Sequence, residues 1–500
     1  MIGKAIAHYQ IEALLGAGGM GEVSTSTRRV RSPELGVVQS QQESSRDSEA
    51  GMIGGERDGT AQTLENLLRR FRKYQFWGGL MFRIRILLLI MVLCISVSAN
   101  AATKAIKFGK LWDGHKVINN AVVVVENDKI VSVTPNGRVP AGAEVIDLSR
   151  FTGIPGMIDA HTHVTYYWDG KPGTTPRTRP EKPRHVAVTV VLSQENGMKA
   201  LQAGVTTLRD LNANGGADYA LRDLINMGKL VGPRLFVSGG GLRSYKGQPG
   251  VTDPIGEAVK MVNTRLDEGS DWIKVFGSMG GFENVKGDQT VSYEEMKAMV
   301  DATHARGHKI AIHSYGPEGA HDAIRAGTDT LEHATDMDDA TIAEMVREGI
   351  WYVPTIDHNQ YYVENADDVY HFAPGSKENL QDYIRRNFAT ATKAFKAGAK
   401  LLVGSDAVYN GFGLNMRELT WFVKMGMTNE QALQTATVNQ AEMLGMEKSL
   451  GSVAPGFFAD IVAVEGDPLA DINVVVNNVR WVMKGGAVVV DKTKPVSKSN

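Results

Sequence analysis

The sequence predicts an α/β protein: a (β/α)8 TIM-like barrel with a small β-sandwich domain formed from both ends of the mature chain. Three observations support this. Eight short apolar segments alternate with helical or loop-rich stretches in the middle of the chain, as in parallel barrels. Alternating apolar segments separated by turns flank this region on both sides. Polar side chains that can bind metal follow several of the eight segments, which favours the barrel over a doubly wound open sheet.

The composition describes a globular protein with metal-binding options limited to nitrogen and oxygen. The chain has 500 residues, of which 43% are hydrophobic and 22% charged, which allows two or three domains or one large barrel with attachments. A formal net charge of -2 gives no electrostatic reason to expect nucleic acid as a partner. The single cysteine, Cys94, lies in an apolar segment. No disulfide or thiolate metal site can therefore form after it.

The first 80 residues are expected to lie outside the working protein. Residues 8–23, HYQIEALLGAGGMGEV, resemble the first strand and glycine-rich loop of bacterial Ser/Thr protein kinases, with Gly16, Gly18 and Gly21 in the expected spacing. No V-A-I-K lysine, H-R-D loop or D-F-G motif follows, and a kinase without those parts cannot position magnesium or a phosphate acceptor. A kinase or signalling role therefore rests on residues 8–23 alone. Residues 24–80 lack sustained periodicity and are predicted to be disordered. Our hypothesis is that residues 1–80 are a gene-fusion remnant or a misassigned start.

Residues 81–101 have the pattern of a secretory signal peptide. Two arginines follow Met81, residues 86–97 form a short apolar run, and Ala99, Asn100 and Ala101 give a small-x-small cleavage site. The apolar run is shorter than the roughly 20 residues of a membrane-spanning helix. We therefore predict cleavage after Ala101, export to the periplasm or the medium, and no stable membrane anchor after signal cleavage.

The mature chain divides into two predicted domains. Residues 102–153 and 449–500 contain the short alternating strands and are expected to pair into the β-sandwich. Residues 154–448 are expected to form the barrel. Its eight strands are predicted in GMIDAHTH, VTTLRDL, RLFVSGG, WIKVFGS, KIAIHS, TLEHA, YVPTI and LLVGSDA.

Six side chains that can bind metal lie at the carboxyl ends of these strands: His161, His163, Lys274, His313, His333 and Asp406. In an extended chain, residues two apart project to the same side, so His161 and His163 can reach one ion. Each residue alone has a structural alternative: a histidine can be a hydrogen-bonded core residue, Lys274 can extend its ammonium to the barrel mouth, and Asp406 can cap a helix. Six such coincidences on one face of one barrel are improbable, so we expect a metal site.

The motifs that carry these residues strongly resemble the amidohydrolase superfamily, in particular its imidazolonepropionase-related, Xaa-Pro dipeptidase-like branch. The resemblance covers roughly residues 104–491. The matching segments are PGMIDAHTH (155–163), IKV (273–275), AIHSYG (311–316), LEHA (331–334), VGSDA (403–407), GSVAPG (451–456) and ADIV (459–462).

The resemblance implies a centre with two divalent metal ions. His161, His163 and Asp406 would bind one ion, His313 and His333 the other, and a carboxylated Lys274 would bridge them. A lysine that captures carbon dioxide becomes an anionic oxygen ligand, whereas an ammonium repels cations. A hydroxide shared by the ions would attack the substrate carbonyl, and Asp406, as the catalytic residue, would move the proton to the leaving amine. Zinc is the first choice, with manganese, cobalt or iron as alternatives.

The residues expected to contact substrate carry weaker signals. Tyr315 follows His313 by two positions and can face the same pocket, and Arg243 with Tyr245 could hold a substrate carboxylate. Many relatives have Gly-Gly-His near this point, but this chain has Lys-Gly-Gln-Pro at 246–249, so that histidine cannot be assigned.

For several other aromatic and imidazole side chains, the sequence allows both a structural and a functional interpretation. Tyr167, within the aromatic run 166–168, could line a pocket or cover the barrel edge. For His358 a structural role is favoured over substrate contact. His304 and His308, four apart on a predicted helix, fit its solvent face better than a second metal site.

The leading functional hypothesis is a hydrolase of amide or peptide bonds in dipeptides or N-acyl amino acids. An alternative is hydrolysis of a cyclic amide, lactam or lactone by the same chemistry. A non-enzymatic alternative is a metal-stabilised binding protein, against which the six occupied metal positions argue. The expected partner is a small-molecule substrate, and the protein is expected to be a homo-oligomer.

Overall fold

The computed structural model describes residues 103–178, 182–213, 215–279 and 287–493 of the chain. The kinase-like segment 8–23, residues 24–80 and the predicted signal peptide at 81–101 lie outside the described residues.

The described residues form strands, α-helices and short 3₁₀- and π-helices. The strands are β1 (Thr103–Trp112), β2 (Val117–Glu126), β3 (Lys129–Pro135), β4 (Glu144–Pro155), β5 (Met157–Thr162), β6 (Val205–Asp210), β7 (Arg234–Val237), β8 (Trp272–Phe276), β9 (Lys309–Ser314), β10 (Thr330–His333), β11 (Trp351–Val353), β12 (Lys400–Leu401), β13 (Ile461–Val464), β14 (Val479–Lys484) and β15 (Ala487–Asp491). The α-helices are α2 (Val186–Gln202), α3 (Ala217–Asn226), α4 (Pro254–Asp267), α5 (Tyr293–Ala305), α6 (Pro317–Ala326), α7 (Asp339–Glu348), α8 (Ile356–Glu364), α9 (Ser376–Lys396), α10 (Glu418–Lys424), α11 (Asn429–Gln434), α12 (Val438–Leu444) and α13 (Asn473–Asn477). The π-helix η1 spans Ala366–Tyr370, and the 3₁₀-helices η2 and η3 span Tyr409–Gly411 and Asn415–Arg417.

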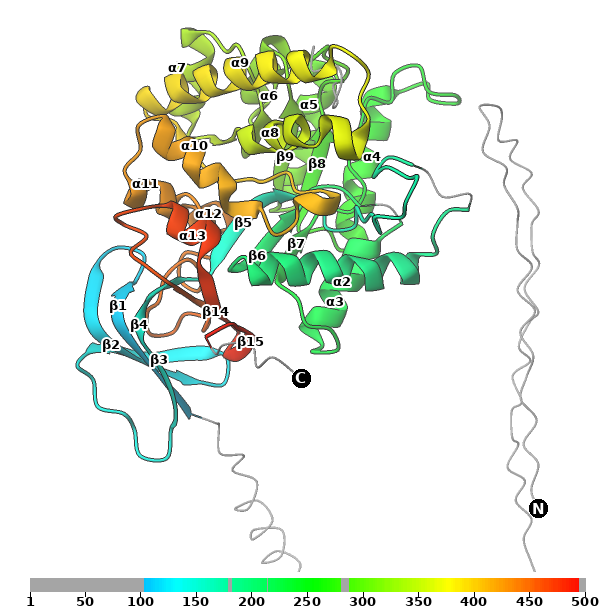
Figure 1. Ribbon diagram of the computed structural model, residues 1–500. Coiled ribbons are helices and arrows are strands. Elements are labelled where there is room, and N and C mark those ends of the chain that lie inside the picture. The colour runs from blue at the N-terminus through cyan, green and yellow to red at the C-terminus, as the bar shows by residue number, and fades with distance from the viewer. Residues whose placement is uncertain (1–102, 179–181, 214, 280–286, 494–500) are drawn as a thin grey trace, which may run out of the picture. The chain divides into compact units, whose positions relative to one another are not determined.

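The two ends of the described chain pair in one seven-stranded sheet with the order β15-β14-β13-β4-β1-β2-β3. Strand β4 joins them, because it runs parallel to β1 and antiparallel to β13. In Figure 1 the blue β1 and β2 and the red β14 and β15 lie at the same end of this part of the molecule. A buried apolar cluster that includes Phe108, Leu111 and Trp481 packs on this sheet. The predicted pairing of the two ends is confirmed, while their arrangement as a sandwich stays a prediction.

The eight strands predicted for the barrel are present as parallel strands in two sheets. One sheet has the order β5-β6-β7, and the other has β12-β11-β10-β9-β8. Single parallel bridges connect Thr162 with Ala407 and Leu242 with Val275, which lie at the facing edges of the two sheets. Helices surround the green strands in Figure 1. The α/β architecture is thus as expected, and continuous closure of the barrel stays a prediction because these bridges are single pairs rather than ladders.

Local sequence signals explain where the helices begin and end. Ser292 and Glu295 form a capping box at the start of α5, and Asp253 caps α4, which opens with a proline. Helices α6 and α7 end at Gly327 and Gly349, both in the left-handed conformation that glycine adopts without strain. The strands β5 and β6 are buried along their whole length, as parallel strands covered on both faces are. These capped helices hold the strand ends, and therefore the side chains that follow them, in fixed positions.

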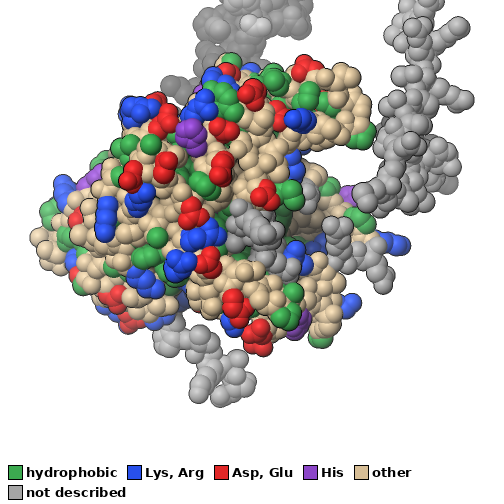
Figure 2. Space-filling view, turned by 90° about the horizontal axis from the view of Figure 1, so that it is seen from above, with side chains coloured by type: hydrophobic (Ala, Val, Ile, Leu, Met, Phe, Trp, Pro, Cys, Tyr) green, Lys and Arg blue, Asp and Glu red, His purple; other side chains and the backbone are tan. Residues whose placement is uncertain are grey.

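Charged side chains on the surface are mixed in sign. On the face shown in Figure 2, Lys and Arg are interspersed with Asp and Glu. None of the helices in the described part of the chain combines the length and the apolar character that crossing a membrane requires.

Candidate metal centre

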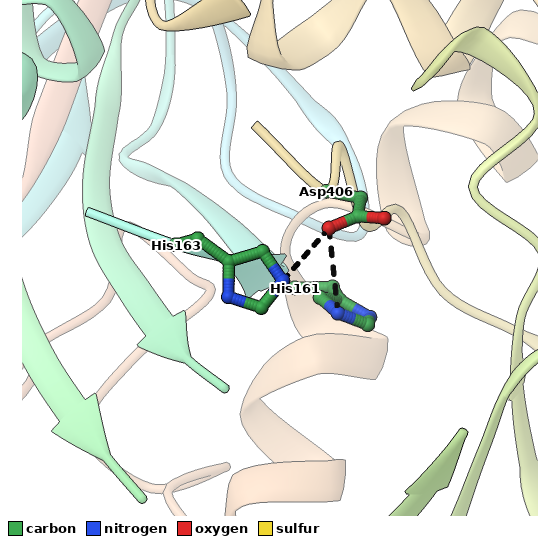
Figure 3. Close-up of side chains that lie close together, drawn as sticks. All are labelled: His161, His163 and Asp406. Carbon is green, nitrogen blue, oxygen red and sulfur yellow. Dashed lines mark ion pairs between the residues drawn. The ribbon is translucent and has the colours of Figure 1, made fainter. Parts of the chain in front are cut away.

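His161, His163 and Asp406 meet at the carboxyl end of the parallel strands (Figure 3). His161 belongs to β5, His163 follows it directly, and Asp406 lies in the segment after β12. Nε2 of His163 lies 3.0 Å from Oδ1 of Asp406, and Nε2 of His161 lies 3.6 Å from the same oxygen. All three residues are buried. One carboxylate oxygen and two imidazole nitrogens thus converge on a point where one cation could bind.

The backbone around Asp406 is fixed by hydrogen bonds to β5. The Asp406 amide donates to the His161 carbonyl over 2.7 Å, and Asp406 has the left-handed φ of 49°, which is uncommon for a residue other than glycine. The preceding Ser405 donates through its amide (2.9 Å) and its hydroxyl (2.6 Å) to the carboxylate of Asp159 on β5. Asp159 therefore positions Asp406 relative to the two histidines.

His333 and His313 continue the cluster of imidazole rings. The ring centroids of His333 and His161 are 5.0 Å apart, and those of His333 and His313 are 4.5 Å apart. His333 ends β10 with a left-handed φ of 74°, and its Nδ1 lies 2.7 Å from Oγ1 of Thr355. Two neighbouring pairs of imidazoles thus lie at one end of the strands. His161 and His163 form the pair next to Asp406, and His313 and His333 form the other.

Lys274, on β8, extends into the same buried region. Its side chain is 1% exposed, and within the described ranges its Nζ has no hydrogen-bond partner. Burial lowers the pKa of Lys274 to about 8, because a charged ammonium is disfavoured away from water. Its charge in turn contributes to lowering the pKa values of His161 and His313.

The residues of this cluster fit a metal centre. Burial is the main cause that lowers the pKa of His161 to about 4 and those of His313 and His333 well below their usual value, so these rings are neutral and keep a lone pair for a metal. Nε2 of His161 and Nζ of Lys274 are buried without a hydrogen-bond partner among the described residues. Buried polar atoms normally have partners. A bound cation, with Lys274 converted to an oxygen donor, would provide them.

Two charged residues that the sequence prediction missed lie behind His161. Oε2 of Glu332 is 2.7 Å from Nδ1 of His161, and Oε1 of Glu332 accepts a hydrogen bond of 2.8 Å from Arg209. Burial alone would raise the pKa of Glu332, but Arg209 and His161 outweigh it and lower the pKa to about 2. The available signal was the presence of charged residues within otherwise apolar, buried strands, since buried charges need partners.

Three of the predicted substrate residues lie close to this cluster. Tyr315 stacks on His333 at 4.9 Å and meets His313 edge-on at 4.6 Å. Nε2 of His358 lies 3.3 Å from Oδ2 of Asp406. The guanidinium of Arg243 lies 4.1 Å from the centre of the Phe276 ring, and Nζ of Lys274 lies 5.1 Å from the same centre. Arg243 is exposed, so a ligand can reach it.

Tyr167 and Tyr245 make other contacts. The Tyr167 hydroxyl donates to Glu195 on α2 over 2.8 Å, and the Tyr245 amide donates to Glu295 over 3.0 Å. It is Tyr166 that stacks on His163, at 5.0 Å and 21° between ring planes. The sequence marked the aromatic run but could not show which of its members faces the cluster.

His304 and His308 form hydrogen bonds with residues outside this cluster. Nε2 of His304 lies 2.9 Å from the Asp329 carboxylate, and Nδ1 of His308 lies 3.2 Å from the Asp271 carbonyl. These are structural hydrogen bonds rather than a shared metal pair.

Comparisons with known proteins show to which family the chain belongs. The amidohydrolase family model matches residues 152–489. The chain is 27% identical over 419 residues to ochratoxinase of Aspergillus niger, covering 75% of this chain and 83% of that protein. It is 23% identical to imidazolonepropionase of Streptomyces coelicolor, covering 70% and 86% of the two chains. A solved Xaa-Pro dipeptidase with methionine in its active site superposes with a TM-score of 0.69 at 29% identity, over 77% of this chain and 99% of that one. The chain therefore belongs to the amidohydrolase family and is a hydrolase of carbon–nitrogen bonds.

Proposed function

We propose that this enzyme uses two divalent metal ions to cleave amide or peptide bonds in small substrates, namely dipeptides or N-acyl amino acids. The observation that carries the proposal is the convergence of His161, His163 and Asp406 on one point, beside two further imidazoles and a buried lysine. Nitrogen and oxygen donors of this kind suit zinc, which is our first choice, and also manganese, cobalt or iron.

The ligands divide into two sets. His161, His163 and Asp406 would hold one ion, and His313 and His333 the other. Lys274 would bridge them as a carbamate, since burial favours the neutral amine that reacts with carbon dioxide. When bound, the ions would supply a water that is acidic enough to ionise near neutral pH and would polarise the carbonyl of the substrate.

Asp406 is proposed to move the proton. Oδ1 of Asp406 faces His161 and His163, while Oδ2 faces His358 at 3.3 Å. The carboxylate would accept a proton from the attacking water and donate it to the amine as the carbon–nitrogen bond breaks, so that Asp406 is ionised again after each turnover.

Arg243 and Tyr315 are proposed to orient the substrate. Arg243 is exposed near Lys274 and offers a guanidinium for a free carboxylate, while Tyr315 covers His313 and His333. One similar protein, a Xaa-Pro dipeptidase, is named for a peptide substrate, and another is ochratoxinase. Their similarity supports a substrate with an amide bond and leaves its side chains open.

We also propose that the eight parallel strands close into a barrel, that the terminal strands form a sandwich, and that the mature enzyme is exported after cleavage following Ala101. N-terminal sequencing of the native product tests the last point. A native protein that begins at Met1 would refute the proposed signal peptide.

The test of function is a substrate screen with protein reconstituted with zinc. We expect hydrolysis of some dipeptides or N-acyl amino acids, with the amine product measured. A preference for lactams or lactones would instead support the ring-opening alternative. Metal binding without hydrolysis of any amide would contradict the proposal and support a binding protein.

A further inference from the structure

Arg209 and Glu332 form a fully buried ion pair, and Glu332 also contacts His161. Both side chains are 0% exposed, and they meet at 2.8 Å. The other Glu332 oxygen lies 2.7 Å from Nδ1 of His161. Burying two charges is costly unless each is well paired, so a pair in this position calls for an explanation beyond stability.

The contact with Glu332 fixes the proton of His161 on Nδ1. An ionised carboxylate can only accept hydrogen bonds, so Nδ1 of His161 must be the donor and Nε2 must carry the lone pair. Nε2 is the atom that points toward Asp406, at 3.6 Å. Glu332 thus sets both the tautomer and the orientation of one proposed metal ligand.

Two other imidazoles of the cluster meet neutral groups at Nδ1 within the described part of the chain. Nδ1 of His163 lies 3.4 Å from the Asn212 carbonyl, and Nδ1 of His333 lies 2.7 Å from the Thr355 hydroxyl. A hydroxyl can donate or accept, so it leaves the tautomer of His333 open. A hydrogen bond from Nδ1 to an acceptor raises the basicity of a metal-binding imidazole, and a charged carboxylate is a stronger acceptor than a carbonyl or a hydroxyl.

Arg209, on β6, contacts three other strands, β5, β8 and β10, and thereby holds Glu332 in place. Its Nε donates to the Ala160 carbonyl on β5 (2.5 Å), and a terminal nitrogen donates to Thr330 on β10 (3.1 Å). Its guanidinium also lies 4.4 Å from the centre of the Trp272 ring on β8. These contacts leave Glu332 little freedom to turn away from His161.

We infer that Arg209 and Glu332 are positioning residues for His161 that make the site of His161, His163 and Asp406 the tighter of the two metal sites. The inference rests on the proposed two-metal centre. It predicts that the ions leave in a fixed order on chelation, the one at His313 and His333 first.

The test compares Glu332→Gln with Thr355→Val, a control of matched shape on the neutral side of the cluster. Zinc affinities are measured by competition with a chromophoric chelator, and metal content by mass spectrometry. We expect wild type to bind two ions with different affinities. Glu332→Gln should weaken the binding of the more tightly held ion by about 10- to 100-fold. Thr355→Val should weaken only the binding of the other ion.

A double variant, Arg209→Met with Glu332→Gln, guards against misfolding because it removes both buried charges together. It should show the same selective loss, and anomalous diffraction of its one-metal form should place the remaining ion at His313 and His333. Unchanged affinities in folded Glu332→Gln, or equal weakening of both ions, would overturn the inference. A wild-type protein that binds no metal would refute the two-metal centre itself.

Discussion

Asp406 shares its two carboxylate oxygens between histidines on either side. Oδ1 lies 3.0 Å from Nε2 of His163, and Oδ2 lies 3.3 Å from Nε2 of His358. Burial alone would raise the pKa of Asp406, but His358 and His161 lower it well below its usual value. Asp406 is therefore ionised at neutral pH, the form needed both to bind a cation and to accept a proton.

Replacing Asp406 with Asn should remove both functions while keeping the side-chain shape. The amide lacks the negative charge and cannot accept the proton at neutral pH. We expect kcat to fall by about 10²- to 10⁴-fold, the usual contribution of a general acid–base group, with loss of metal from the His161 and His163 site. Kinetics and metal content measured on the same preparation check both effects.

The companion variant His358→Gln distinguishes the two sides of Asp406. It removes the imidazole next to Oδ2 but leaves the proposed ligands in place. We expect wild-type metal content and a smaller loss of kcat than in Asp406→Asn. Activity like wild type in Asp406→Asn would exclude the proposed role of this carboxylate.

Lys274→Ala should lose metal and activity together, because it removes the proposed bridging ligand, a side chain that is only 1% exposed. Native mass spectrometry of wild type should show an adduct of one carbon dioxide that disappears in acid and is absent in the variant. Lys309→Gln is the control. Lys309 lies on the next strand, β9, at the end away from the cluster, and its Nζ donates a hydrogen bond to the Met443 carbonyl. A Lys274→Ala protein that keeps two ions and full activity refutes the bridge.

Much of the fold could be predicted because its strands are short apolar runs with clear turn signals. Lys274, His313 and His333 were found in the same way, since each is a polar residue within or at the end of such a run. The pairing of β4 with both β1 and β13 depends on contacts between distant parts of the chain. The sequence indicated that the ends meet but not that one strand joins them.

The residues that support the site were harder to predict. Glu332 and Arg209 are 123 positions apart and pair only in the folded chain. The sequence shows a charged residue in each of two apolar strands, but it does not show that the two residues are partners. Tyr166 and Tyr167 are adjacent, and only the path of the loop decides that Tyr166 stacks on His163. Side-chain identity predicted which polar residues cluster at the strand ends, whereas the partners that orient them required coordinates.

Gly404→Ala should disturb the centre without touching a ligand side chain. A Cβ at Gly404 would clash with Cγ1 of Val353 on β11 and would lie 2.9 Å from Cβ of His161 on β5, so the segment carrying Asp406 must move away from both strands. We expect a loss of about 1–3 kcal/mol in the free energy of unfolding, typical of overpacking, and weaker metal binding. Chemical denaturation and metal titration measure these effects.

Gly411→Ala is the matched control in the same segment, because its Cβ would meet only Ala407 Cβ at 4.0 Å, an ordinary contact. It should keep wild-type stability and metal affinity. Equal behaviour of the two variants would show that the close approach at Gly404 does not position the site.

The Glu332 carboxylate should make the metal-free protein sensitive to acid in a defined range. Its folded pKa of about 2 lies below the ordinary 4.5, because Arg209 and His161 favour the charged form. The resulting stabilisation, up to about 3 kcal/mol, is fully present above pH 4.5 and is lost as the pH falls toward 2. Urea denaturation of chelator-treated protein across this range should therefore show the stability difference between wild type and Glu332→Gln shrinking with falling pH. A difference that stays constant from pH 5 to pH 2 would mean that Glu332 is not held ionised by its neighbours, and that its hydrogen bond to His161 does not depend on charge.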